Sequence, residues 1–294
     1  MDATSGKTVL RFILLLFGVV CISTAVILLK ASTEHPLLVA AYRLLIAAVL
    51  LSPFFFRDLA RYEGKYGWKQ LGWSFLPAVL LAAHFSSWVV GARMTQVANA
   101  SLIINLTPVA MPFFVWLLFK ERIRRREVIG TLFTLGGVAL LTGQNFRVDP
   151  GSFLGDVICL GSMLGFAAYL ALGRKNGARL GLWLYTVPLY GMAGLLCLGG
   201  ALFFLNPIKE YSMPNILYIV GLAVVPTILG HSILNASLRY FRGQVVSLTN
   251  VASPLFAGFF GYLAFGELPG MLFYPAAALI LAGISIVLFQ RTET

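Results

Sequence analysis

Apolar residues along this chain gather into ten long runs, separated by short segments that hold most of the charged residues. Each run is close to the roughly 20 residues that a helix needs to cross the hydrocarbon core of a membrane. The runs are Val9–Leu29, Pro36–Phe56, Leu71–Gly91, Val97–Phe119, Val128–Gly143, Phe153–Leu172, Leu182–Leu205, Ile216–Leu238, Val245–Phe265 and Met271–Phe289. The pattern therefore predicts an all-α polytopic membrane protein with ten transmembrane helices.

Composition supports this prediction, because the chain is 59% hydrophobic and only 11% charged, with a mean hydropathy of +0.86. The net charge of +11 would also suit a nucleic-acid-binding protein, but here the placement of the charges along the chain is more informative. Of the 22 Lys and Arg residues, 17 fall on one side of the predicted membrane, 4 on the other and Arg43 inside the second run. Basic residues prefer cytoplasmic loops. We therefore expect both termini in the cytoplasm, a lipid bilayer as the surroundings and no nucleic acid as a partner.

The stretch from Ala98 to Glu127 occurs twice. Shifted by 146 residues, the segment that begins at Ser101 matches the segment that begins at Ser247 with 8 identities in 21 positions and no gap. Shared apolar composition alone would give roughly two identities, which indicates an internal duplication. We expect a first repeat over residues 1–147 and a second over residues 148–294. Five spans per repeat is an odd number, so the two five-helix repeats should be inverted relative to each other.

Polar residues are rare inside the predicted spans, and they fall on matching helices of the two repeats. Burying such groups in hydrocarbon is unfavourable unless they find partners, so their faces should look at one another across a central substrate cavity. A small molecule is the partner that such a cavity would bind. The candidate substrate-binding residues are Arg43, His84, Trp88, Asn105, His231, Asn235 and Asn250.

Each candidate also has a structural interpretation. The histidines could hydrogen-bond to neighbouring helices, and Trp88 could belong to the core. Asn105 and Asn250 could cap carbonyl groups that the prolines three and four residues later leave free. Arg43 lies about 11 Å from the outer end of its span, so it could extend outward to water, or it could balance a substrate carboxylate or phosphate.

Several chemistries are absent from the sequence. No Asp or Glu lies at the centre of a span, which argues against a carboxylate proton relay or a buried cation site. No zinc-protease, nucleotide-binding or serine-hydrolase motif occurs, and the three cysteines lie far apart inside apolar runs. We expect no enzyme activity, no cofactor, no metal and no catalytic residue. The fifth and tenth runs carry few polar side chains, and we expect them to be peripheral or to face a second copy in a homodimer.

Each repeat has a proline followed 13 residues later by a glutamate and then by a helix that contains glycine: Pro108, Glu121 and Gly137, and Pro254, Glu267 and Gly283. Together with the Ala-Ala-Tyr-Arg-Leu-Leu sequence of the second run, this pattern resembles EamA-type proteins of the drug/metabolite transporter superfamily. The resemblance covers nearly the whole chain. It implies a cavity lined by spans 1 to 4 and 6 to 9, with spans 5 and 10 outside.

Members of this family mostly export amino acids, related metabolites or toxic amphiphiles. The resemblance therefore implies a secondary transporter in the plasma membrane, the bacterial inner membrane, that exports small amphipathic metabolites by alternating access. The alternatives are a flippase for lipids or lipid-linked sugars, a sugar-phosphate or nucleotide-sugar exchanger, and a membrane scaffold without transport. The central polar lining separates these classes, because a scaffold would not need it.

Overall fold

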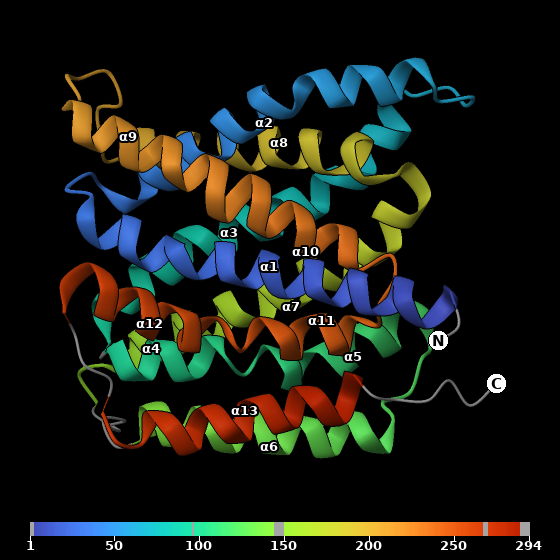
Figure 1. Cartoon of the computed structure of the whole chain (residues 1–294). Helices are drawn as coiled ribbons and strands as arrows, with labels where there is room; N and C mark the ends of the chain where they lie inside the picture. The colour runs from blue at the N-terminus through green and yellow to red at the C-terminus, as the bar shows by residue number, and fades with distance from the viewer. Residues whose placement is uncertain (1–2, 96, 144–149, 267–269, 289–294) are drawn as a thin grey trace. The chain divides into compact units, whose positions relative to one another are not determined.

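The computed structural model describes residues 3–95, 97–143, 150–266 and 270–288, and the regular elements in these ranges are helices (Figure 1). The helices are α1 (Ala3–Ala31), α2 (Pro36–Ala60), α3 (Trp68–Met94), α4 (Val97–Ile104), α5 (Thr107–Phe119), α6 (Arg125–Thr142), α7 (Phe153–Leu180), α8 (Leu182–Leu202), α9 (Met213–Leu222), η2 (Ala223–His231), α10 (Ser232–Ser237), α11 (Gly243–Asn250), α12 (Ser253–Phe265) and α13 (Phe273–Leu288). The predicted all-α class is confirmed.

Among the described residues, eight helical segments are long and apolar enough to cross a membrane. Two further helices coincide with the fifth and tenth apolar runs. The first of them, α6, starts with three charged residues, and the second, α13, has 16 residues. The count of ten spans therefore stays a prediction. Glu267 and the predicted boundary between residues 147 and 148 lie outside the described residues.

The duplication seen in the sequence recurs in the helix boundaries. Adding 146 to the bounds of α4 and α5 gives the bounds of α11 and α12. Both pairs are separated by two residues, Asn105–Leu106 in the first copy and Val251–Ala252 in the second. The two copies are therefore interrupted at equivalent residues.

The interruption between α4 and α5 has its cause in Pro108, whose missing N–H leaves the carbonyl of Ile104 without its usual partner. The hydroxyl of Thr107 donates to that carbonyl at 2.7 Å. From its sequence, Pro112 could be expected to break the helix as well, but this expectation is wrong, because Pro112 lies inside a continuous α5. The carbonyl that Pro112 frees, that of Pro108, accepts a hydrogen bond from Nε2 of Gln244 on α11 at 2.9 Å. The Gln244 side chain, which belongs to the second copy of the repeat, thus provides the hydrogen bond that Pro112 removes from α5.

The two copies also end in the same backbone conformation. Lys120 follows α5 with a φ of 58°, and Gly266 follows α12 with a φ of 69°. Glycine adopts this left-handed region without a steric penalty, whereas a residue with a Cβ loses roughly 1–2 kcal/mol there. Lys120 is the one residue other than glycine with a positive φ in the part of the chain that the structure describes.

The helices form two compact units, each built from both halves of the sequence. Unit 1 comprises Met1–Ser86 and Leu172–Tyr240, and unit 2 comprises Ser87–Ala171 and Phe241–Thr294. In unit 1, α2 packs against α8 and α1 packs against η2; in unit 2, α6 packs against α13 and α5 against α11. The pairs α2–α8 and α6–α13 are visible as neighbours in Figure 1. Division of the chain by repeat, at residue 147, remains a prediction.

The α6–α13 pair has one buried and one exposed face. Ala276, Ile280 and Ile284 of α13 are buried, as are Gly130 and Gly137 of α6. On the other face, large apolar side chains of both helices are exposed: Val128, Leu132, Phe133, Tyr274 and Leu281. An exposed apolar face of this kind suits contact with lipid.

Candidate functional site

A buried arginine lies at the centre of a polar cluster in unit 1. Arg43 belongs to α2 and is only 4% exposed. Its Nε donates a hydrogen bond to the hydroxyl of Thr227 at 2.9 Å, and its Cζ lies 4.9 Å from the centroid of the Phe85 ring. The side chain therefore does not extend to the outer end of its helix, as one reading of the sequence had allowed. It is held among α2, α3 and η2.

Thr227 occupies the middle of η2, a π-helix of nine residues that contains Pro226. In this wider helix the Thr227 hydroxyl donates to the carbonyl of Leu222, five residues earlier, at 2.8 Å. The same oxygen accepts the hydrogen bond from Arg43. Short π-helices occur frequently at functional sites, and this one presents a fixed acceptor to a buried guanidinium.

The ring of Phe85 joins three of the predicted site residues. The His84 ring centroid lies 5.3 Å from it and the His231 ring centroid 5.9 Å, in addition to the contact with Arg43. Both histidines are buried. Asn235, one turn after His231 on α10, donates from Nδ2 to the His231 carbonyl at 2.9 Å. Unit 1 thus brings Arg43, His84, His231 and Asn235 into one neighbourhood.

Hydroxyl groups extend this cluster toward α8. The hydroxyls of Tyr190 and Ser232 lie 3.2 Å apart, and the Ser232 hydroxyl reaches the Thr227 carbonyl at 3.5 Å. Tyr190 is fully buried. Neither Tyr190, Thr227 nor Phe85 was a candidate from the sequence. The available signals were Pro188 and Pro226, since a proline inside a span requires local polar compensation.

The other three predicted residues, Trp88, Asn105 and Asn250, belong to unit 2. Asn105 donates from Nδ2 to the Ser101 carbonyl at 2.8 Å, which is a bond within its own helix turn. The indole Nε1 of Trp88 and the Oδ1 of Asn250 are buried, and neither atom has a hydrogen-bond partner among the described residues. Asn105 therefore has a local structural role, whereas Trp88 and Asn250 each retain one unused polar atom.

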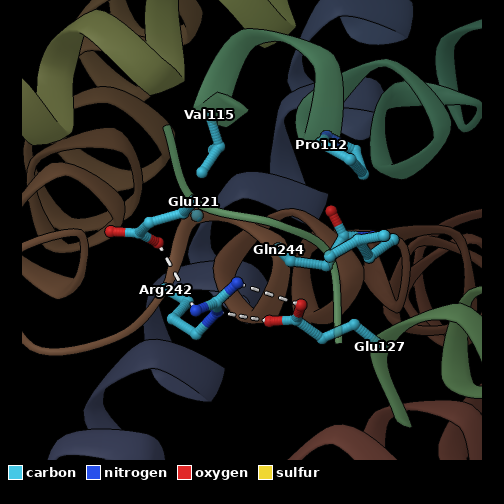
Figure 2. A pocket seen from close by; sticks show the side chains of 8 residues that line it. Pro112, Val115, Glu121, Glu127, Arg242 and Gln244 are labelled. Atoms are coloured by element: carbon cyan, nitrogen blue, oxygen red, sulfur yellow. Dashed lines mark hydrogen bonds and ion pairs between the residues drawn. The ribbon is translucent and has the colours of Figure 1, made fainter. Parts of the chain in front are cut away.

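A second polar cluster in unit 2 was not predicted from the sequence, and Figure 2 shows it around a small pocket. The guanidinium of Arg242 donates to both carboxylate oxygens of Glu127, at 2.6 Å from Nε and 3.2 Å from Nη2. Its Nη1 lies 3.4 Å from the Glu121 carboxylate, and its Nη2 also donates to the Arg122 carbonyl at 3.0 Å. Glu127 is completely buried, and it accepts a further bond from the backbone N–H of Arg124 at 2.8 Å.

Gln244 lines the same pocket and is buried on α11 (Figure 2). Besides its bond to the Pro108 carbonyl, its Nε2 donates to the Thr131 hydroxyl at 2.9 Å. Gln244 therefore connects α11 to α5 and α6. The sequence signal for this role was an amide directly before the ninth apolar run.

A third cluster lies at the loop end of unit 1 near the start of α2. Glu34 forms an ion pair with Lys209 at 2.5 Å. Nearby, the Tyr211 hydroxyl donates to the Pro207 carbonyl at 2.9 Å and lies 3.1 Å from the Tyr42 hydroxyl. Burial, followed by the hydrogen bond with Tyr42, raises the pKa of Tyr211. These contacts hold the loop that follows α8 against the start of α2.

A family model described as "EamA-like transporter family" matches residues 10–143 and 153–289 of the chain. The chain belongs to the EamA-like transporter family. The match covers most of both sequence repeats and places the polar clusters described above inside a multi-pass membrane transporter. Its substrate is accordingly a small molecule, and its surroundings are membrane lipid.

Individual relatives of this EamA-like protein agree with that assignment. An uncharacterized transporter of Archaeoglobus fulgidus is 25% identical over 92% of this chain and 94% of its own length. The chloroplastic WAT1-related protein At3g02690 of Arabidopsis thaliana is 25% identical over 87% of this chain and 63% of its own. Solute carrier family 35 member G1 of Homo sapiens is 22% identical over 82% and 68%, respectively.

The fold of the EamA-like chain also occurs in a solved crystal structure, described only as that of a protein. It matches 94% of this chain and 95% of its own with a TM-score of 0.80 and 18% sequence identity. This likeness concerns the fold alone. The family and the named relatives indicate a transporter and not an enzyme.

Proposed function

We propose that this EamA-like protein is a secondary transporter that exports small amphipathic metabolites, such as amino acids or related compounds, by alternating access. The observation that supports the proposal is a set of buried polar atoms without hydrogen-bond partners among the described residues: Nη2 of Arg43, Nε1 of Trp88 and Oδ1 of Asn250. Most buried polar atoms in proteins are hydrogen-bonded, and an exception calls for an explanation. A polar substrate supplies the missing partners.

The chemistry of these atoms defines the substrate that they suit. In unit 1, Arg43 offers a donor; in unit 2, Trp88 offers a donor and Asn250 an acceptor. In unit 1, the Phe85 ring contacts both Arg43 and His231. A molecule with one or two polar groups and an apolar body matches this mixture. A scaffold would derive no benefit from unsatisfied polar atoms in its spans.

Three substitutions, one in unit 1 and two in unit 2, test whether these residues bind substrate. Trp88→Ala, His231→Ala and Asn250→Ala should each weaken substrate binding by roughly ten- to a hundredfold, because the loss of one such contact removes about 1–3 kcal/mol. Binding is measured with purified protein, and uptake or efflux is measured in proteoliposomes. Leu135→Ala on α6 and Leu281→Ala on α13 are the controls, and they should affect mainly expression or stability. Normal transport by all three site variants, together with loss of transport in the controls, would place the site elsewhere.

Direction is tested in cells. Cells that express the protein should accumulate less of a toxic amino-acid analogue or amphipathic compound and tolerate it better than cells that express Trp88→Ala. Accumulation that increases with expression would reverse the proposed direction.

We further propose that the protein lies in the plasma membrane, the bacterial inner membrane, with both termini in the cytoplasm. The three native cysteines are buried, so that a new surface cysteine can be labelled selectively. Arg125→Cys should react with a membrane-impermeant maleimide only after the cells are permeabilised, when the reagent can reach the cytoplasmic face. Glu210→Cys should react in intact cells. Labelling of both positions from one side contradicts this topology.

A further inference from the structure

Arg43 carries a positive charge inside the membrane-spanning part of unit 1, and no carboxylate among the described residues of this unit balances it. Among the described residues Arg43 forms no ion pair. The described acidic residues of unit 1 all lie outside the centres of the helices. Glu34 pairs with Lys209, Asp58 pairs with Arg57, and Glu63 and Glu210 are exposed.

The observed contacts of Arg43 leave part of its guanidinium unused. Nε bonds to Thr227, and the Phe85 ring lies against the cation. Nη2 is buried and has no hydrogen-bond partner among the described residues. A hydroxyl and an aromatic ring are neutral, so they cannot neutralise the charge. A buried charge of this kind is unfavourable until an opposite charge approaches it.

Thr227 does not satisfy the remaining donors of the guanidinium, because its bond is with Nε and Nη2 has no partner among the described residues. Its hydroxyl hydrogen is directed to the Leu222 carbonyl within the π-helix, and its oxygen already accepts from Nε of Arg43. The π-helix therefore fixes one edge of the guanidinium and leaves Nη2 for another acceptor. Arginine binds carboxylate and phosphate groups through two parallel N–H donors.

We infer that Arg43 binds an oxyanion of the transported substrate, a carboxylate or a phosphate. This inference rests on the proposed transport function and specifies the chemical class of its substrate. The oxyanion supplies the opposite charge and an acceptor for Nη2. The Phe85 ring lies against the guanidinium, and the rings of His84 and His231 contact Phe85. We expect these rings to contact the part of the substrate next to the oxyanion.

Ligands that share one branched carbon chain test the inference: leucine, isocaproate, isopentyl phosphate and isocaproamide. Binding to the detergent-purified full chain is followed by the rise in its thermal midpoint with ligand concentration. We expect the oxyanions to raise the midpoint and the neutral amide to leave it unchanged. The tighter of isocaproate and isopentyl phosphate identifies whether the site prefers a carboxylate or a phosphate.

Substitutions of Arg43 test whether oxyanion binding depends on its guanidinium. Arg43→Gln should weaken oxyanion binding by roughly ten- to a hundredfold, and Arg43→Lys, which keeps the charge without the two parallel donors, by less. Arg57→Gln removes an exposed cation from the same helix and should retain full affinity. Without ligand, Arg43→Gln should unfold at the same or a higher temperature, because it removes an unbalanced buried charge. A lower midpoint together with unchanged oxyanion affinity would assign Arg43 a structural role and overturn the inference.

Two further outcomes separate this inference from the proposed function. Binding of isocaproamide as tight as that of isocaproate overturns the oxyanion assignment, even if proteoliposomes transport both compounds. Oxyanion binding that depends on Arg43 supports the assignment; if proteoliposomes with the wild-type chain then fail to exchange the bound compound, only the transport proposal is overturned.

Discussion

Replacing Arg242 with alanine should lower the free energy of unfolding by about 3 kcal/mol, because Glu127 is then buried without its cation. Removing one partner of a buried ion pair typically destabilises a protein by roughly 3–5 kcal/mol. The lower end applies here, since the Arg242 side chain is 22% exposed and Glu127 keeps the hydrogen bond from the backbone N–H of Arg124. Thermal unfolding of the detergent-purified protein measures the change.

Comparison variants separate this ion pair from general effects of lost charge. Arg239→Ala removes an exposed arginine three residues earlier and should change stability by less than about 0.5 kcal/mol. Glu121→Gln should also have a small effect, since the Glu121 carboxylate is 28% exposed and 3.4 Å from Arg242. When Glu127→Gln is combined with Arg242→Ala, the loss should be smaller than the sum of the single losses. Equal midpoints for Arg242→Ala and Arg239→Ala would contradict a stabilising role for the pair.

A second large effect is expected where α6 and α13 approach each other through glycine. A Cβ atom on Gly137 would lie 2.6 Å from the Ala276 carbonyl oxygen and 2.6 Å from Cγ1 of Ile280. The carbonyl belongs to the backbone of α13 and cannot rotate away. Gly137→Ala should therefore separate the helices and destabilise the protein by about 1–3 kcal/mol.

The preceding residue provides a matched control for this substitution. A Cβ on Gly136 would meet only Cδ1 of Leu279, at 3.8 Å, which is ordinary van der Waals contact. Gly136→Ala should be neutral or stabilise α6 by up to about 1 kcal/mol, since alanine favours helix over glycine. The two neighbouring substitutions should thus have opposite signs in thermal unfolding. A loss of stability in both would show that the contact with α13 is not the cause.

Much of the fold could be predicted because hydrocarbon imposes strong constraints on sequence. Helix α2 begins at Pro36 and α8 at Leu182, as the apolar runs do, and the interruption before Pro108 follows from a missing N–H. The structure of the eighth run could not be predicted. It is divided into α9, the π-helix η2 and α10. A π-helix differs from an α-helix in its backbone hydrogen bonds, which join residues five apart, and the pattern of apolar side chains along the sequence does not reveal this difference.

The candidate site was only partly accessible from the sequence. Rare polar residues in spans indicated Arg43, His84, His231 and Asn235. The structure places the first three around Phe85, and Asn235 donates to the His231 carbonyl. Phe85 and Thr227 could not be selected, because one is apolar and the other is common in membrane helices as a partner of its own backbone. The Arg242–Glu127 pair was missed because both residues lie at helix ends, where charged residues usually face water.

The residues that end α5 and α12 share a left-handed backbone conformation but differ in charge, and the proposed inverted topology gives that difference a meaning. Identical copies with opposite orientations would give the membrane-insertion machinery no preferred direction, so their loops must diverge in charge. In the proposed topology Lys120 faces the cytoplasm, and its ammonium lies 4.5 Å from the centroid of the Trp116 ring. The equivalent residue Gly266 carries no charge. Lys120 therefore places a cation at the end of α5 together with about 1–2 kcal/mol of backbone strain, a strain that the uncharged glycine at the end of α12 avoids.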